Sequence, residues 1–328
     1  MKSYQVVGIG NAIVDVLAQT DDMFLDHMGI TKGIMQLIER DRAETLYSSM
    51  RERTEAPGGS VANTLAGLGN LGLTTAFIGR VRDDALGRFY VKAMSSEGTD
   101  FPNPPVVGAS LPTSRSMIFV TPDGERSMNT YLGISADLGT DDVSDDVAGG
   151  AEILFLEGYL FDKDGGKAAF LKAARACRAG GGRAGIALSD PFCVDRHRPD
   201  FRRLVTELDY VIGNEHEWQS LYQTDTLDAA LTLAAADCPL VVCTRSGSDV
   251  VMFGPEGRVE APVHRVVPVD ATGAGDQFAA GFLYGLATGQ SLRIAGQMGC
   301  IAAAEVIGHF GARPESDVKA LFRAKGLI

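Results

Sequence analysis

The chain has 328 residues, a length that allows one large α/β domain or two ordinary ones. Hydrophobic residues make up 45% and charged residues 22%, which excludes a disordered chain, and the 39 glycines predict particular backbone turns. The formal net charge is −12 and no block of Lys or Arg is present, so nucleic acid and anionic membranes are poor partners. Phosphate would have to be bound locally, by a helix N-terminus, backbone amides or a metal.

The cysteines and the apolar segments indicate a cytoplasmic protein without a membrane span. Five scattered cysteines, none with Cys-x-x-Cys spacing, predict reduced and mostly buried thiols. No apolar run reaches the ~20 residues of a membrane-spanning helix. The N-terminal stretch makes a poor signal peptide, because Asp15 interrupts it and only Lys2 precedes it.

Strands and helices are mixed in the first 131 residues. Strands are predicted over 4–10 and 74–78, a helix over 40–53, and an amphipathic helix that begins after Gly58-Gly59 with Ser60 as its N-cap. Two further pieces, 17–38 and the proline-rich stretch and hairpin over 101–131, are strand-like. We expect these two pieces to form a small sheet, or lid, inserted into one domain over 1–328.

From residue 152 the pattern alternates between strands and helices. The predicted strands cover 152–156, 185–189, 210–213 and 240–244, and the predicted helices cover 166–179, a segment near Phe201, 215–222 and 227–236. A hairpin over 250–253 and 258–261 precedes two helices, 276–287 and 291–308, that close the chain. This alternation predicts a doubly wound, mostly parallel α/β sheet flanked by helices, with ligands bound at the carboxyl ends of its strands.

Several short motifs match only in part. Gly67-x-Gly69-x-x-Gly72 lies at the end of a helix, Gly8-x-Gly10 lacks its third glycine because Ile13 stands there, and no Walker A sequence is present. His216-Glu217 begins like a zinc-protease helix, but Ser220 occupies the position of the second histidine. These motifs therefore predict neither a dinucleotide site nor a zinc site.

The segment from Asp270 to Asp276, DATGAGD, carries the clearest chemical signal. It leads directly into an apolar helix, so the amides of Gly273, Ala274 and Gly275 would be uncovered at a helix N-terminus. Such an anion hole can neutralise a phosphoryl group while Asp276 accepts a proton. The alternative is that Asp276 is only an acidic residue in the first turn of a helix.

DATGAGD resembles the second signature of the ribokinase-like (PfkB) carbohydrate kinases, and the segment from Gly58 through GRVRDDALG resembles the first. The opening GIGNAIVD, the N-x-x-E of Asn214 to Glu217 and the turn from Thr244 to Gly247 follow the family in order. The resemblance covers nearly the whole chain. It implies a phosphotransferase that uses ATP and Mg²⁺.

The resemblance also implies roles for individual residues. Asp276 would be the catalytic base and Gly273, Ala274 and Gly275 the anion hole, while Asn214, Thr244, Gly247, Thr272, Gly273 and Gly275 would contact the nucleotide. Glu217 and Asn214 would hold Mg²⁺ through water, with helix capping by Asn214 and a surface acid at 217 as the alternative. A monovalent cation, K⁺, would lie near Asp270 and Gly311.

For the acceptor, the family positions are Asn11, Asp15, Gly59, Ser60 and Asn63. Asp15 would bind two sugar hydroxyls, since a carboxylate in an apolar run needs partners, although it could simply lie on the exposed face of its strand. Ser60 could serve only as an N-cap. Of the two lid arginines, Arg126 rather than Arg115 is expected to clamp a phosphate, with a solvated surface charge as the alternative.

The opening, the lid and the LSDPF segment resemble adenosine kinases more than ribokinases. In that alignment the nucleobase would lie near Leu37, Ser116, Met128, Leu132 and Tyr159, which could otherwise be lid or core residues. Met35 departs from the glutamine usual there, and Ala271 is an unusual second residue of DATGAGD. We therefore expect a nucleoside, adenosine first, as acceptor, with ribokinase-like or fructokinase-like sugar phosphorylation and a catalytically inactive regulator as alternatives. The chain would be a monomer or a lid-paired homodimer.

Overall fold

The computed structural model describes residues 2–328 and contains two β-sheets. The strands of the large sheet are β1 (Tyr4–Ile9), β5 (Thr75–Ile78), β6 (Thr99–Asp100), β9 (Ala151–Glu157), β10 (Arg183–Ala187), β11 (Tyr210–Asn214), β12 (Val241–Arg245), β13 (Ser248–Gly254) and β14 (Gly257–Ala261). Those of the small sheet are β2 (Ile13–Gln19), β3 (Met35–Leu37), β4 (Thr54–Gly58), β7 (Ser114–Val120) and β8 (Arg126–Tyr131).

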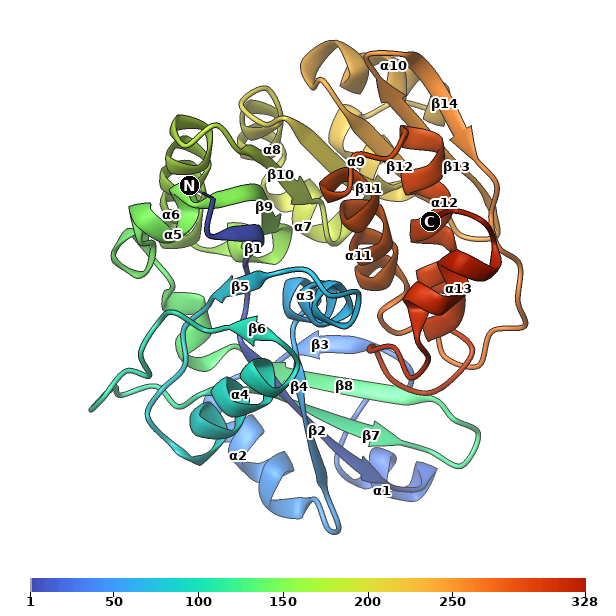
Figure 1. Cartoon of the computed structure of the whole chain (residues 1–328). Helices are drawn as coiled ribbons and strands as arrows, with labels where there is room; N and C mark the ends of the chain where they lie inside the picture. The colour runs from blue at the N-terminus through green and yellow to red at the C-terminus, as the bar shows by residue number, and fades with distance from the viewer. Residues whose placement is uncertain (1) are drawn as a thin grey trace.

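The helices of the described chain are α1 (Asp22–His27), α2 (Arg40–Ser49), α3 (Ser60–Asn70), α4 (Ala85–Ser96), α5 (Asp145–Gly149), α6 (Asp164–Ala179), α7 (Pro191–Arg196), α8 (Arg198–Val205), α9 (Glu215–Tyr222), α10 (Leu227–Asp237), α11 (Ala274–Ala287), α12 (Leu292–Val306) and α13 (Val318–Ala324). Figure 1 shows the large sheet and its helices in the upper part of the view and the small sheet, in blue to green, below them.

The large sheet has the order β14-β13-β12-β11-β10-β9-β1-β5-β6. Its strands pair in parallel from β6 to β12, and only the β13–β14 end is antiparallel. Parallel strands covered on both faces need apolar side chains on both faces, and Val6, Val7 and Ile9 of β1 are all fully buried. The predicted doubly wound, mostly parallel α/β fold is therefore confirmed.

Helices cover both faces of this sheet and enclose two apolar cores. On one face α3 packs against β1, β5 and β9 and also against α11, which in turn packs on α12. On the other face α5 and α6 cover β9 and its neighbours, and α9 and α10 cover β11 and β12. The packing of α3 on α11 matters for the site, because it brings the helix after β4 against the helix that follows DATGAGD.

The small sheet, in the order β3-β8-β7-β2-β4, differs from its prediction. It begins at Ile13, not at residue 17, and α1 interrupts the stretch 17–38 because the Asp21 side chain caps that helix by accepting from Phe24 N–H. The predicted helix over 40–53 ends at Ser49. The edge strand β4 that follows was missed because it contains Pro57, a residue that strands accept mainly at an edge.

Other segments also differ, and the short elements β6, α5 and α7 were not predicted. The predicted lid piece began at residue 101, but 101–112 forms no strand apart from an isolated bridge between Val106 and Arg82, and β7 begins at Ser114. The helix α4 was not predicted. The helix α13 follows the two helices that were expected to close the chain.

The cysteines agree with their prediction, since all five are free and buried. Burial raises the pKa of the Cys238 and Cys300 thiols to about 11, so neither is a nucleophile at neutral pH.

Among residues 2–328, no helix combines the length and the apolar character needed to cross a bilayer.

Candidate active site

A cavity of about 760 Å³ lies where the carboxyl ends of the central parallel strands face the small sheet. Ligands of open α/β sheets bind at this edge, and the volume suits a small molecule. Most of the predicted site residues line it: Asn11, Asp15, Leu37, Gly59, Ser60, Asn63, Ser116, Met128, Leu132, Tyr159, Asn214, Glu217, Thr244, Thr272, Gly273, Ala274, Gly275 and Asp276. The predicted residues Arg126, Gly247, Asp270 and Gly311 lie outside the lining.

The anion loop, residues 270–275, leads into the N-terminus of α11. Gly273 is its N-cap and has a φ of 78°, a left-handed conformation that favours glycine. The predicted set of three amides is wrong in one member, because the Ala274 N–H donates to the Ala271 carbonyl at 3.2 Å within the turn. The N–H groups of Gly273 and Gly275 have no acceptor within residues 2–328, so these two remain available to an anion.

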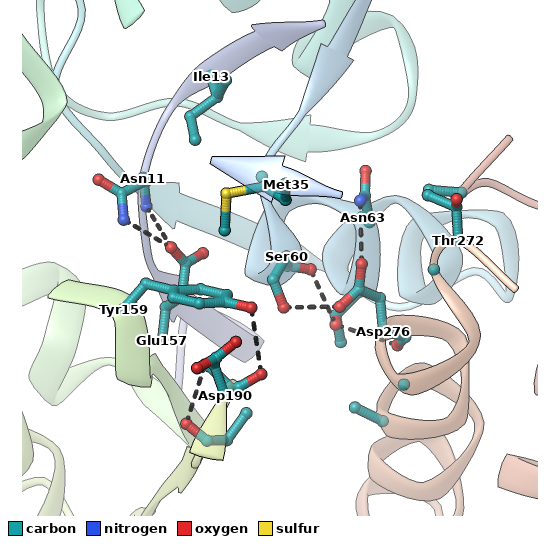
Figure 2. Close-up of a pocket in the computed structure, with 18 of the residues that line it drawn as sticks. Asn11, Ile13, Met35, Ser60, Asn63, Glu157, Tyr159, Asp190, Thr272 and Asp276 are labelled. Atoms are coloured by element: carbon teal, nitrogen blue, oxygen red, sulfur yellow. Dashed lines mark hydrogen bonds between the residues drawn. The ribbon is translucent and has the colours of Figure 1, made fainter. Parts of the chain in front are cut away.

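Asp276 lies in the first turn of α11 and faces the N-terminus of α3. Its Oδ1 accepts from Ser60 Oγ at 2.6 Å and its Oδ2 from Asn63 Nδ2 at 3.0 Å, as Figure 2 shows. The Thr64 hydroxyl donates to the Asp276 carbonyl at 3.0 Å. Burial raises the pKa of Asp276 to about 6, against the effect of the two side-chain hydrogen bonds. This carboxylate is both held in place and able to accept a proton near neutral pH.

Ser60 is not the N-cap of α3, contrary to the prediction. Gly59 takes that position with a φ of 99°, and Ser60 is the first helical residue, which frees its hydroxyl for Asp276. A Cβ at Gly59 would lie 2.3 Å from the Asn11 carbonyl oxygen, so the close approach of these segments requires glycine.

Glu157, at the end of β9, is a site residue that the sequence interpretation missed. It is 1% exposed and accepts from Asn11 N, Asn11 Nδ2 and Val61 N at 3.1, 2.8 and 3.2 Å. Burial raises the pKa of Glu157 to about 7 despite these hydrogen bonds. An acid at the end of a predicted strand was the only available signal. Figure 2 shows the contacts of Glu157 with Asn11, and the bond from Val61 N connects this pair to the first turn of α3.

Asp15, on β2, faces the cavity, so the alternative of an exposed strand face does not hold. Burial raises the pKa of Asp15 to about 7, while Arg313 and Arg126 act to lower it. No hydrogen bond to its carboxylate is found within residues 2–328. A carboxylate in this position can accept hydrogen bonds from a ligand with adjacent hydroxyls.

The predicted nucleobase residues all line the cavity, and one of them, Ser116, is the register partner of Asp15 on the neighbouring strand. Leu37 and Met128 lie on the paired strands β3 and β8, and Tyr159 lies just after β9. The Tyr159 hydroxyl donates to the Ser189 carbonyl at 3.2 Å, which holds its ring at the cavity wall (Figure 2). Met35, which stands where adenosine kinases usually carry a glutamine, also lines the cavity. This surface can stack against a flat apolar ligand.

Asn214 and Glu217 form a capping box at the start of α9. Asn214 N and Nδ2 donate to the Glu217 carboxylate, each at 2.8 Å, and the Glu217 N–H donates to Asn214 Oδ1. Helix capping, the simpler alternative, is therefore present, but Glu217 is 5% exposed and lines the cavity, so it is not a surface acid. Burial raises the pKa of Glu217 to about 7, against the hydrogen bond from Asn214.

The donor set of the cavity fits a divalent cation that arrives with a phosphate ligand. Residues 2–328 contain no cluster of three or more His, Cys, Asp or Glu that would form a protein cage. Mg²⁺ typically keeps several waters and uses one or two carboxylates together with phosphate oxygens, which Glu217 and Asn214 could supply. The lining includes Asp15, Glu157, Asp162, Asp190, Glu217 and Asp276, against one basic residue, Arg196. Arg196 pairs with Asp162, so a polyphosphate needs a cation of its own here.

Arg126 does not reach the cavity, because it pairs with Asp270 at 3.0 Å and ties β8 to the anion loop. Arg115 stacks on the Tyr47 ring instead.

The Asp270 carboxylate also accepts from Thr272 N and Oγ1 and from Gly311 N–H. Burial acts to raise the pKa of Asp270, but these hydrogen bonds and Arg126 outweigh it. With donors on all sides, this carboxylate does not fit a monovalent cation, and we assign no step to K⁺.

The fold and this cavity define the class of protein. The model of the pfkB family of carbohydrate kinases matches residues 26–319. The chain therefore belongs to this family and is a phosphotransferase, as the resemblance implied.

Particular relatives differ in the acceptor that their names give. A probable sugar kinase from Rhizobium etli superposes with a TM-score of 0.91 at 43% identity, over 100% of both chains. Adenosine kinase from Sinorhizobium meliloti superposes with a TM-score of 0.90 at 45% identity, over 99% of this chain and 100% of the other. A 5-dehydro-2-deoxygluconokinase from Geobacillus thermodenitrificans is 27% identical over 306 residues, which are 81% of this chain and 83% of the relative.

Proposed function

We propose that this kinase transfers the γ-phosphoryl group of ATP to the 5′-hydroxymethyl group of a nucleoside, with adenosine as the acceptor that we favour. The observation that carries the proposal is one cavity whose lining combines Asp276 and two free amides with an apolar surface that includes Leu37, Met128 and Tyr159. Asp276 and the two amides can support phosphoryl transfer, and the apolar surface can hold a nucleobase.

In this mechanism Asp276 accepts the proton of the attacking hydroxyl. The hydrogen bonds from Ser60 and Asn63 hold its carboxylate in one orientation, and its pKa of about 6 leaves it ionised at neutral pH. Such a base needs to lie within hydrogen-bond distance of the hydroxyl, about 2.6–3.2 Å. Asp15 would accept hydrogen bonds from the ribose hydroxyls and so position the ring.

The N–H groups of Gly273 and Gly275 would bind the equatorial oxygens of the transferred group as it leaves ATP. Mg²⁺, bound through water to Glu217 and Asn214, would neutralise phosphate charge that the acidic cavity otherwise repels. Thr244 lies on the same side of the cavity as Asn214, its register partner in the sheet, and would contact the nucleotide.

The adenosine kinase from S. meliloti, at 45% identity over nearly the whole chain, supports a nucleoside acceptor. The sugar kinases among the relatives support phosphorylation of a sugar or sugar acid as the second candidate. An inactive regulator would have no need of Asp276 beside free amides, which argues against the third candidate.

Turnover of a panel of acceptors tests the proposal. With ATP and Mg²⁺, adenosine is expected to give the largest kcat/KM among adenosine, inosine, ribose, fructose and 5-dehydro-2-deoxygluconate, because only nucleosides use the apolar surface. The product would be the 5′-monophosphate, identified by ³¹P NMR. Selective turnover of a sugar with adenosine inert would contradict the proposal, and no turnover of any acceptor would favour a regulator.

The pH dependence is a second test, because the base must be deprotonated to act. Since burial raises the pKa of Asp276 to about 6 and that of the acceptor-binding Asp15 to about 7, kcat/KM should begin to fall below about pH 7 and fall more steeply below 6, where Asp276 is protonated as well. Measurements from pH 4.5 to 8.5 would show this acid limb. The residual activity of Asp276→Asn is the control: it should keep the part of the limb due to Asp15 and lack the steeper fall below pH 6. A wild-type rate that rises toward low pH would contradict the role of Asp276.

A further inference from the structure

Arg313, in the segment between α12 and α13, lies outside the cavity lining and directly behind it. Only 18% of its side chain is exposed. Its guanidinium pairs with Glu97, the C-cap residue of α4, and its Nε–H donates to Asn63 Oδ1 at 3.3 Å. Asn63, which is 6% exposed, therefore lies between Arg313 and Asp276.

The partners of Asn63 allow only one orientation of its amide. An arginine side chain can only donate and an ionised carboxylate can only accept. Asn63 Oδ1 must face Arg313, and Asn63 Nδ2 must then face Asp276. If the amide turned over, its NH₂ group would face a guanidinium and its oxygen a carboxylate, and both contacts would become repulsive.

We propose that Arg313 is a positioning residue that holds the Asn63 amide in the orientation that donates to Asp276. The inference rests on the proposed role of Asp276 as the base, whose carboxylate is oriented by the contacts from Ser60 and Asn63. Arg313 touches neither Asp276 nor the cavity, and it acts through Asn63.

The same guanidinium also supports the second carboxylate that faces the cavity. Among charged groups, Arg313 makes the largest contribution that lowers the pKa of Asp15. Three titratable groups lie near Asp276: Asp15 on β2, Glu157 on β9 and Tyr159 just after β9. The charge of Asp276 raises the pKa of each of them. Arg313 is thus a buried cation behind an acidic cavity wall.

Two substitutions separate the contact with Asn63 from the charge. Arg313→Met removes both. Arg313→Lys keeps a charge near Glu97 but places a methylene where Nε lies, so it cannot donate to Asn63 in the same way. Arg178→Met, which removes a guanidinium paired with Asp209 on the surface, is the matched control.

The test is a ¹³C NMR titration of the Asp276 carboxyl carbon in the protein without ATP or acceptor, with the signal assigned by its loss in Asp276→Asn. A net hydrogen bond is worth roughly the free energy of half to one pKa unit. Arg313→Met and Arg313→Lys should therefore both raise the Asp276 midpoint by about 0.5–1 pH unit, and Arg178→Met should leave it unchanged. In the Asn63→Ala background, Arg313→Lys should cause no additional shift, because it keeps the charge and the contact with Asn63 is already absent.

An unchanged midpoint in a folded Arg313→Met protein would overturn the inference. So would a wild-type midpoint in Arg313→Lys beside a shifted one in Arg313→Met, since charge alone would then be the cause. If Arg313→Met does not fold, Arg313→Lys carries the test, because it retains a cation for Glu97. Turnover is not needed for this readout, so a failure of the acceptor panel would contradict the proposed function without deciding the role of Arg313.

Discussion

Replacing Asp276 with asparagine is expected to lower kcat by about 10²–10⁴-fold, the range associated with loss of a positioned general base. Asparagine has the same shape and can still contact Ser60 and Asn63, which now hold the carboxylate at 2.6 and 3.0 Å. The loss should therefore come from proton transfer and not from misfolding. Steady-state kinetics with saturating ATP and Mg²⁺ would measure it.

Acceptor binding should survive the same substitution, because Asp15 and the apolar surface contact the acceptor independently of Asp276. Binding by calorimetry should thus remain within a few-fold of wild type. Asp200→Asn, at a surface carboxylate paired with Lys167, is the matched control and should retain full activity. A fall in kcat of less than tenfold for Asp276→Asn would mean that another group accepts the proton.

The second large effect is expected at Gly273. A Cβ there would lie 2.6 Å from the Ala312 Cα, and the φ of 78° is unfavourable for any other residue. Gly273→Ala should therefore displace the anion loop and lower kcat by about 10²–10³-fold, as removal of an oxyanion donor does. The strain should also lower the free energy of unfolding by about 1–3 kcal/mol, which chemical denaturation would measure.

Gly275 provides the matched control for that strain. A Cβ at this position would meet no atom within 4 Å, and its φ is not positive. Gly275→Ala should keep the wild-type free energy of unfolding and lose activity only because its methyl group enters the space in front of a free amide. If Gly273→Ala were as stable and active as wild type, the anion loop would not have the proposed role.

Local patterns in the sequence were sufficient for the parts of the fold with strong periodicity. The alternation of strands and helices after residue 152 and the glycine spacing before Asp276 predicted the large sheet and the anion loop. The small sheet was harder, because β4 carries Glu55 and Pro57 and reads as a loop. Its pairing with β2 supplies the backbone contacts that make it a strand.

The missed site residues share a physical reason. Glu157 and Arg313 are distant in sequence from the residues they contact, so neither contact belongs to a local motif. The N-cap expected at Ser60 was wrong because Gly59 itself takes the cap position with a φ of 99°, and the Ala274 amide donates within a turn of its own motif. Motif matching found the right loops, but the hydrogen-bonding state of each group needed the structure.

The most direct test of the proposed function is a crystal structure with adenosine and a non-hydrolysable ATP analogue. We predict that the 5′ oxygen will lie within about 2.6–3.2 Å of the Asp276 carboxylate. The ribose should contact Asp15, the base should lie against Tyr159, and the γ-phosphate should face the amides of Gly273 and Gly275. A nucleoside bound with its 5′ oxygen directed away from Asp276, or a cavity that excludes adenosine and admits only a sugar, would contradict the proposed function.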